Sequence, residues 1–347
     1  MKPVRSGILV FRFSAMGDVA MTAPVLAAFR EQYPDIPLGV VSRNAFTPFF
    51  ADIPRLSFHS LEPKGRHKGL TGLFKLFLEL NATRPKAIAD LHNNLRSRIL
   101  GLFFFFCGVP VIRVEKAREE KKQLTRKNNK VLRPLLAMTE RYASVFHKLG
   151  FPVKLSHQLP PKNPQVIPDS LAEICGDKMN TKWIGVSPFA QHPQKVYPAE
   201  KMQQVILQLA ERGYQIFIFG GGPAEQIIGA EWAAGHPRIK SIIGKANLEQ
   251  ELALISNLDL MISMDSSGMH LASLKGIPVV SIWGATHPFT GFLGYGQSLQ
   301  DVVQLDLYCR PCSVYGNKPC YRGDFACMNN LPESVVIQTV INKLNNE

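Results

Sequence analysis

Short runs of hydrophobic residues alternate with amphipathic stretches along almost the whole chain. In the first half, apolar runs predict buried strands, and the stretches between them place apolar residues at helical spacing. This alternation is typical of a parallel β-sheet covered by helices. The predicted strands are ILVFRF, PLGVVS, AIADLH and VIRV, and the predicted helices lie around residues 19–33, 70–80 and 95–106. The four phenylalanines Phe103–Phe106 belong to the last helix and are interpreted as its buried face.

A proline-rich stretch, FPVKLSHQLPPKNPQVIP, follows this half of the chain. It has no sustained period and is interpreted as an inter-domain connector. The alternation then restarts with the predicted strands WIGVS, QIFIFGG, SIIG, LMISMD and PVVSIWG. Predicted helices follow them as PAEKMQQVILQLAERG, PAEQIIGAEWAAG, LEQELALISNLD and SGMHLASLKG. The first of these has Pro198 near its start and Gly213 past its end, the usual asymmetry of helix termini.

These patterns predict an α/β protein of two doubly wound, Rossmann-like domains that face each other across a cleft. In such sheets, ligands bind beyond the carboxyl ends of the strands. We expect an N-terminal domain over residues 1–160, a linker over 161–175, a C-terminal domain over 176–330 and a C-terminal helix over 331–347.

The composition is that of an ordinary globular chain. It has 347 residues, 46% hydrophobic and 19% charged, which is long enough for two domains. Glycine and proline interrupt the longest apolar stretch, ILGLFFFFCGVPVI, which is shorter than the roughly 20 residues of a membrane-spanning helix. No apolar signal-peptide core follows Met1, so we expect a cytoplasmic location.

The chain is strongly basic, with a net charge of +13, and this excess indicates an anionic partner such as nucleic acid, a nucleotide or a membrane surface. Between Arg113 and Arg133, nine Lys or Arg residues stand against three Glu. No RNP pattern, helix-turn-helix or basic patch interleaved with aromatics supports nucleic-acid binding. For any single lysine, a solvated surface is the better explanation. A second basic cluster comprises Lys64, Arg66, Lys68 and Lys75.

The first predicted strand ends at a small, glycine-containing turn, and a helical pattern follows. This arrangement commonly binds a phosphate at the helix N-terminus. Here, however, Asp18 follows Gly17 directly and places a carboxylate where a phosphate needs N–H groups. One explanation is that Asp18 complements the helix dipole.

Four segments of the second half lie at predicted strand ends: SPFAQHPQK, GGGPAEQ, MDSSGMHL and WGATHP. DSSGMH best fits an anion site, because Ser266 or Ser267 can cap the helix and small residues allow a ligand to approach the backbone. A capped helix without a ligand explains it as well, and a tight turn explains the three glycines. His270 alone is more typical of a packed core. The absence of G-x-G-x-x-G and of a P-loop argues against a dehydrogenase and an NTPase.

Two of these regions together resemble a known family. ILVFRFSAMGDVAMTAPVLAAFREQYP and DSSGMHLASLKGIPVVSIWGATHP are similar to the two ends of the ADP-heptose:lipopolysaccharide heptosyltransferases, glycosyltransferase family nine. The resemblance implies a GT-B fold whose C-terminal domain holds the nucleotide sugar. It also implies an inverting, metal-independent reaction with no cofactor. The partners would be the donor ADP-heptose, an anionic Kdo-bearing lipid A or inner-core acceptor, and the inner face of the cytoplasmic membrane, with no nucleic acid.

By this resemblance, Asp18 would be the general base that takes the proton of the attacking sugar hydroxyl. Lys195 and the N–H groups at residues 266–270 would stabilise the departing diphosphate. Glu225 would accept hydrogen bonds from the ribose, and Asp265 would bind the donor sugar or orient the turn. The expected nucleotide-sugar residues are Lys195, Gly221, Gly222, Glu225, Asp265, Ser266, Ser267, Gly268 and His270.

The expected acceptor residues follow the first and third predicted strands of the N-terminal half. In DLHNNLRSRIL, two arginines follow the strand, and the arginine fork suits Kdo carboxylates and lipid phosphates. The expected set is Ser14, Gly17, Asn94, Arg96 and Arg98.

The chain departs from the family pattern after Asp265. Relatives usually carry glycine directly after D-S/T, whereas here Ser267 occupies that position and Gly268 follows it. A different nucleotide sugar is therefore one alternative. A nucleotide-sugar epimerase of similar fold is another, because such proteins share glycine-rich turns and a two-domain cleft. An epimerase needs no acceptor, and the basic N-terminal half would then have no explanation.

Four cysteines lie close together in CRPCSVYGNKPCYRGDFAC. This spacing is compatible with a tetrathiolate zinc site, with reduced cytosolic thiols or with a disulfide. We assign these cysteines no catalytic role and expect no metal in the active site. They are Cys309, Cys312, Cys320 and Cys327.

Overall fold

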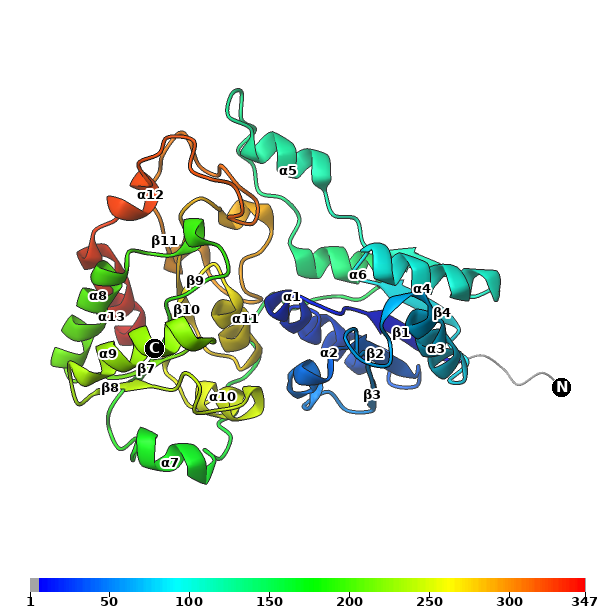
Figure 1. Cartoon of the computed structure of the whole chain (residues 1–347), viewed down its shortest axis with the longest axis horizontal. Coiled ribbons are helices and arrows are strands. Elements are labelled where there is room, and N and C mark those ends of the chain that lie inside the picture. Colours follow the sequence, from blue (N-terminus) through cyan, green and yellow to red (C-terminus); the bar gives the residue numbers. More distant parts are fainter. Residues whose placement is uncertain (1–5, 347) are drawn as a thin grey trace. The chain divides into compact units, whose positions relative to one another are not determined.

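The computed structural model describes residues 6–346 and divides them into two compact units (Figure 1). Unit 1 comprises the chain up to Lys116 together with Ala137–Ser156. Unit 2 comprises Ala117–Leu136 together with the chain from His157 onward.

The segment Ala117–Leu136 belongs to unit 2, whereas the sequence places it in the N-terminal domain. Helix α5 (Arg118–Thr125) begins this segment. Two contacts explain the grouping: Lys121 Nζ lies 4.4 Å from the ring centroid of Phe292, and the backbone N–H of Leu135 donates to Phe289 O at 2.9 Å. The predicted start of the N-terminal domain at residues 1–5 and the predicted end of the C-terminal helix at residue 347 lie outside the described residues.

Unit 1 is built on a five-stranded parallel sheet in the order β3-β2-β1-β4-β5. Its central strand β1 is buried at all four positions, as the apolar run predicts. The sequence did not predict β3, in which only half-buried and exposed residues occur. The strands are β1 (Ile8–Phe11), β2 (Leu38–Ser42), β3 (Leu56–Ser60), β4 (Ala87–Asp90) and β5 (Val111–Arg113).

Helices flank this sheet, and one of them differs from the prediction. The helix expected around residues 19–33 is two helices, α1 (Met16–Ala20) and α2 (Ala23–Gln32). Pro24 lies in the first turn of α2, where its missing N–H and its ring prevent the first helix from continuing. The other helices of unit 1 are η1 (Asn44–Phe50), α3 (Gly69–Asn81), α4 (Leu95–Phe106) and α6 (Met138–Lys148).

The prediction that Phe103–Phe106 form a buried face is wrong for half of the run. Phe104 is fully buried, whereas Phe105 and Phe106 at the end of α4 are 62% and 76% exposed. An α-helix turns by about 100° per residue, so four consecutive side chains cannot point in one direction.

Unit 2 contains a six-stranded parallel sheet in the order β11-β10-β9-β6-β7-β8. The strand predicted at residues 241–244 lies two residues earlier, and the short strand β11 was not predicted. The expected linker contains helix α7 (Asp169–Cys175). The strands are β6 (Trp183–Ser187), β7 (Gln215–Ile218), β8 (Ile239–Ser241), β9 (Leu260–Met264), β10 (Val279–Ile282) and β11 (Val302–Val303).

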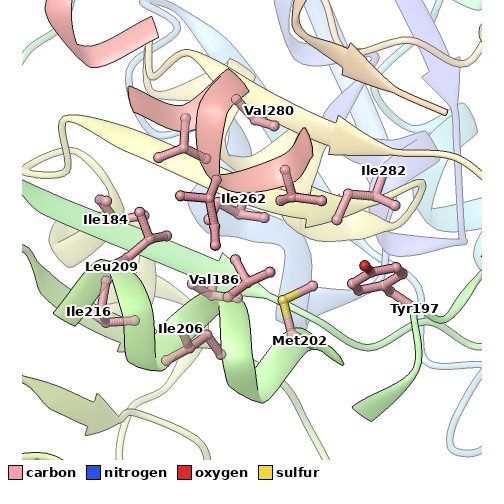
Figure 2. Close-up of a cluster of buried hydrophobic side chains, with 14 of the residues drawn as sticks. Ile184, Val186, Tyr197, Met202, Ile206, Leu209, Ile216, Ile262, Val280 and Ile282 are labelled. Carbon is pink, nitrogen blue, oxygen red and sulfur yellow. The ribbon is translucent and has the colours of Figure 1, made fainter. Parts of the chain in front are cut away.

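Helices α8 and α13 pack against each other and against this sheet. Figure 2 shows the buried aliphatic side chains of β6, β9 and β10 beside those of α8. Tyr197 closes one end of this core, and its hydroxyl donates to Leu331 O at 2.7 Å. The helices of unit 2 that follow the connector are α8 (Ala199–Glu211), α9 (Pro223–Ala234), α10 (Leu248–Ile255), α11 (Ser267–Leu274), α12 (Ala326–Asn329) and α13 (Glu333–Asn345).

Within residues 6–346, no helix combines the length and the apolar character that crossing a bilayer requires.

Candidate active site

The strand order of unit 1 reverses at β1, because β2 and β3 lie on one side of it and β4 and β5 on the other. Ligands of open α/β sheets bind beyond the carboxyl ends of the strands at such a switch point. The segments that follow β1 and β4 are Arg12–Asp18 and Leu91–Asn94. The topology therefore brings together two of the segments that the sequence singled out.

Arg12 joins these two segments. Its buried guanidinium donates to Leu91 O at 2.8 Å, forms an ion pair with Asp18, and lies over the ring of Tyr142. The Asp18 side chain remains 27% exposed, so a ligand can reach its carboxylate. Asp18 also lies in the first turn of α1, as the helix-dipole explanation predicts. Sequence reasoning did not identify Arg12, which lies in the middle of an apolar run.

Asp90 anchors the turn between β4 and α4. Its fully buried carboxylate accepts hydrogen bonds from the backbone N–H groups of His92 and Asn93 and from the Ser97 hydroxyl. Burial raises the pKa of Asp90, and these hydrogen bonds lower it in part. Asn94 caps α4 by accepting from the backbone N–H of Ser97 at 2.9 Å. The side-chain oxygen of Asn94 therefore caps the helix. Binding of the sugar acceptor, which the sequence analysis expects of Asn94, is left to its amide nitrogen.

His92 is a second candidate that sequence reasoning missed. It is 8% exposed, its ring lies 5.2 Å from that of Phe13, and its Nδ1 has no hydrogen-bond partner within residues 6–346. Burial first, and nearby positive charges second, lower the pKa of His92 to about 3. An uncharged imidazole nitrogen can accept a hydrogen bond from a sugar hydroxyl. The nearby positive charges are Arg12, Lys116, Arg43 and Arg96.

This lowered pKa predicts how stability depends on pH. Between about pH 3 and pH 6.5, the unfolded chain binds a proton at His92 that the folded chain does not bind. The free energy of unfolding should therefore fall with decreasing pH below 6.5, by up to about 1.4 kcal/mol per pH unit from this group. We expect His92→Gln to reduce this slope in urea denaturation at pH 5 and pH 7. The matched control is His147→Gln, at an exposed position on α6, which should keep the wild-type slope. An unchanged slope in His92→Gln would contradict the assignment.

The strand order of unit 2 reverses between β6 and β9. The segments that follow these strands carry Lys195 and Asp265. Their side chains form an ion pair, with Lys195 Nζ 2.8 Å from Asp265 Oδ2, and both side chains are largely buried. The structure thus brings together two residues that the sequence placed in separate motifs.

The side chain of Lys195 packs against a glycine, Gly316. A Cβ atom at Gly316 would lie 2.5 Å from Lys195 Cγ, so the lysine stem packs closely against this turn. Gly316 has φ +74°, a conformation that favours glycine. The turn belongs to the cysteine-rich segment, whose Cys312 N–H donates to Ala285 O at 2.9 Å. We therefore assign this segment a supporting role for Lys195.

Helix α11 starts at the switch point with half-buried Ser266 and Ser267. Ser266 occupies the N-cap position, but its side chain makes no capping hydrogen bond, contrary to the expected role. Gly268 allows α11 to approach β6, because a Cβ atom there would lie 2.3 Å from Ser187 Oγ. Gly268 therefore serves helix packing, and His270 is buried two residues further along α11.

The three glycines lead into α9. Gly222 is the N-cap of this helix with φ +99°, and Gly221 donates its N–H to Glu225 Oε2 at 2.7 Å. A Cβ atom at Gly220 would lie 2.8 Å from the same carboxylate oxygen. One carboxylate oxygen of Glu225 thus closes the turn, and the other oxygen remains for a ligand.

Thr286, beyond β10, was missed by sequence reasoning, and its buried hydroxyl has no hydrogen-bond partner within residues 6–346.

The four clustered cysteines line one cavity of about 10 Å³ together with Arg310. All four are free thiols. Among residues 6–346, no group of three or more His, Cys, Asp or Glu side chains has an arrangement that could hold a metal ion. Arg310 is buried and donates to the carbonyl oxygens of Trp283 and Thr286, each at 3.0 Å.

The structure therefore places most of the expected residues at two switch points, one in each unit. In unit 1, Ser14, Gly17 and Asp18 follow β1, and the residues around Asn94 follow β4. Arg98 is held at this turn, because its Nε donates to Asn93 Oδ1 at 2.8 Å. In unit 2, Gly221, Gly222 and Glu225 follow β7, next to the strand that precedes Lys195.

Solved structures share this architecture. That of the glycosyl transferase family 9 protein from Veillonella parvula DSM 2008 aligns with a TM-score of 0.76, covering 100% of this chain and 99% of that chain at 19% identity. The E. coli heptosyltransferase WaaC with ADP aligns with a TM-score of 0.66, covering 97% and 99% at 18% identity. The fold is therefore of the GT-B type, which confirms the predicted fold class.

The sequence identifies the family within this fold. The family profile of glycosyltransferase family 9 (heptosyltransferase) matches residues 73–320. The chain belongs to this family and is a glycosyltransferase, which confirms the resemblance. Lipooligosaccharide heptosyltransferase 2 of Campylobacter jejuni is 25% identical over 338 residues, 94% of this chain and 95% of that protein. Lipopolysaccharide heptosyltransferase 3 of E. coli K12 is 24% identical over 286 residues, 78% of this chain and 80% of that protein.

Proposed function

We propose that this glycosyltransferase transfers a heptose from ADP-heptose to the Kdo-bearing inner core of lipopolysaccharide, with inversion at the anomeric carbon. One observation carries this proposal: the chemistry at the two switch points is complementary. Unit 1 offers an accessible carboxylate, Asp18, among positive charges. Unit 2 offers a lysine, Lys195, beside the N-terminus of a helix. The relatives named above are heptosyltransferases of lipooligosaccharide and lipopolysaccharide, which supports the sugar and the class of acceptor.

Unit 2 would hold the donor. The diphosphate would accept hydrogen bonds from the N–H groups at the start of α11 and from Lys195, whose partner Asp265 holds the ammonium group in place. The free oxygen of Glu225 would accept from a ribose hydroxyl. When the bond between the anomeric carbon and the diphosphate breaks, its electron pair remains on the phosphate oxygen, and these donors stabilise the new charge.

Unit 1 would hold the acceptor. The acceptor hydroxyl oxygen attacks the anomeric carbon from the face opposite the diphosphate, and Asp18 takes the hydroxyl proton. The ion pair with Arg12 fixes the orientation of this carboxylate. This edge of the sheet is positively charged, as binding of a Kdo carboxylate requires. The charges are those that act together on His92, namely Arg12, Arg43, Arg96 and Lys116.

We also propose that the transfer needs no divalent metal, because a lysine and a helix N-terminus already provide positive charge for the leaving diphosphate. The Ser267–Gly268 departure from the family pattern does not remove the N–H groups of α11. Gly268 lies against Ser187 in the sheet, and Ser266 and Ser267 at the helix start are only half-buried.

A panel of nucleotide sugars tests this proposal. The full chain is incubated with ADP-heptose, ADP-glucose, UDP-glucose or UDP-N-acetylglucosamine, with and without Kdo-bearing lipid A, and each reaction is run in the presence and in the absence of EDTA. We expect nucleotide release and heptosylated acceptor only with ADP-heptose and only when acceptor is present. Transfer of another sugar would overturn the donor assignment, and loss of transfer in EDTA would overturn the metal-independent mechanism.

A further inference from the structure

Two neighbouring helices of unit 1, α3 and α4, carry apolar side chains that face solvent. On α3, large apolar residues recur every four positions, and on α4 they recur at spacings that also bring them to one side. The two helices pack against each other, as Figure 1 shows. The exposed fractions are Leu70 65%, Phe74 48%, Leu78 53%, Leu95 76%, Leu102 46%, Phe105 62% and Phe106 76%.

We call the exposed apolar side chains of these two packed helices the α3–α4 face. Phe74 of α3 contacts Phe103 of α4 edge-on, with ring centroids 5.5 Å apart. Phe105 and Phe106 contact each other at 6.1 Å. The opposite side of each helix lies in the core of unit 1, where Phe77 and Phe104 pack at 5.0 Å. The apolar character of the face is therefore additional to what the fold of unit 1 requires.

Basic residues dominate the charges around the α3–α4 face, and the one acidic residue of α3, Glu79, is paired with Arg66 and His67. The sequence contains no acidic residue between Glu62 and Glu79 or between Asp90 and Glu115. Exposed Lys68 and Lys75 lie on or beside α3. On α4, an open groove of about 500 Å³ lies among two arginines and two apolar side chains, and its lining residues are Arg98, Ile99, Leu102 and Arg113.

We propose that the α3–α4 face docks on a bilayer that contains anionic phospholipids. Phe105 and Phe106 would insert at the interface, and Arg98 and Arg113 would bind lipid phosphates in the groove. Exposed aromatic and aliphatic side chains bordered by lysine and arginine are the chemistry that binds such a surface. A second copy of the chain fits less well, because a symmetric contact would bring the same positive charges together.

This inference is independent of the proposed donor and of Asp18, because it rests on surface side chains of α3 and α4 and on Arg113 of β5. It explains the part of the basic excess between Lys64 and Arg113. It also predicts strong salt dependence, since exposed charges are screened within about 8 Å at physiological ionic strength.

The test is sedimentation of the full chain with vesicles of phosphatidylcholine alone or of phosphatidylcholine with phosphatidylglycerol, without donor or acceptor. We expect at least about tenfold stronger binding to the anionic vesicles, and loss of this preference at high salt. The double variant Phe105→Ser/Phe106→Ser should bind these vesicles at least tenfold more weakly. The control Val166→Ser/Met179→Ser removes two side chains of unit 2 that are 91% and 87% exposed, and it should bind like wild type.

Equal binding to both kinds of vesicle, or unchanged binding by the phenylalanine variant, would overturn the inference. So would a concentration-dependent dimer that this variant abolishes, because the face would then be an interface between copies. ADP affinity of the phenylalanine variant, measured in parallel, should equal that of wild type. A failure of the docking inference is thus distinguishable from a failure of the proposed transfer reaction.

Discussion

Replacing Asp18 by asparagine is expected to lower kcat for heptosyl transfer by about 10²- to 10⁴-fold, the usual contribution of a general base. Asparagine keeps the shape of the side chain but cannot take the hydroxyl proton. Because Asp18 lies in unit 1 and the donor is assigned to unit 2, the dissociation constant for ADP should not change. The measurement is steady-state ADP release at saturating donor and acceptor, together with calorimetric titration of ADP.

The Asp18→Asn variant also loses its ion pair with Arg12, so its unfolding temperature must be measured alongside. Arg12 retains its hydrogen bond to Leu91 O, which should keep the turn after β1 in place. Asp35→Asn is the matched control, because Asp35 is an exposed aspartate of the same unit. A folded Asp18→Asn enzyme with the wild-type kcat would exclude Asp18 as the base.

The second large effect is expected from Lys195→Met. Loss of a charge-assisted hydrogen bond worth ~1.5–3 kcal/mol corresponds to an increase in the ADP dissociation constant of about 10- to 150-fold. The effect has a second source, since the variant leaves the Asp265 carboxylate, 6% exposed, unpaired beside the diphosphate. The double variant Lys195→Met/Asp265→Asn removes this repulsion and should bind ADP more tightly than the single variant.

Calorimetry with ADP measures both effects, and Lys245→Met provides an exposed-lysine control in the same unit. Unaltered ADP affinity in Lys195→Met would remove the lysine from the donor site. If the double variant bound ADP no better than the single variant, Asp265 would not face the diphosphate.

The repeated alternation of apolar runs and amphipathic stretches was sufficient to predict two parallel sheets, because strands buried on both sides are continuous apolar runs. Strand β3 escaped this reasoning because its residues are half-buried or exposed at a sheet edge. Phe105 and Phe106 were misplaced because composition, without the angular position on the helix, cannot show which side a residue faces.

For the candidate site, the motifs were sufficient to predict that Asp18, Lys195 and Asp265 follow the ends of strands. Their ion pairs were not predicted. Arg12 lies within an apolar run that gave no sign of a contact with Asp18, and Lys195 and Asp265 follow different strands that only the fold brings together. His92 lacked any local signal, since its significance depends on burial and on charges from four separate segments. The close approach of Gly268 to Ser187 likewise appears only when β6 and α11 are placed together.

The anomeric configuration of the product tests the central claim most directly, namely that Asp18 activates the acceptor in a single displacement. The measurement is NMR of the heptosylated acceptor after reaction with ADP-heptose, compared with the configuration of the donor. The account predicts a product whose anomeric centre is inverted. A retained configuration would contradict it, because retention requires a different sequence of steps at the anomeric carbon.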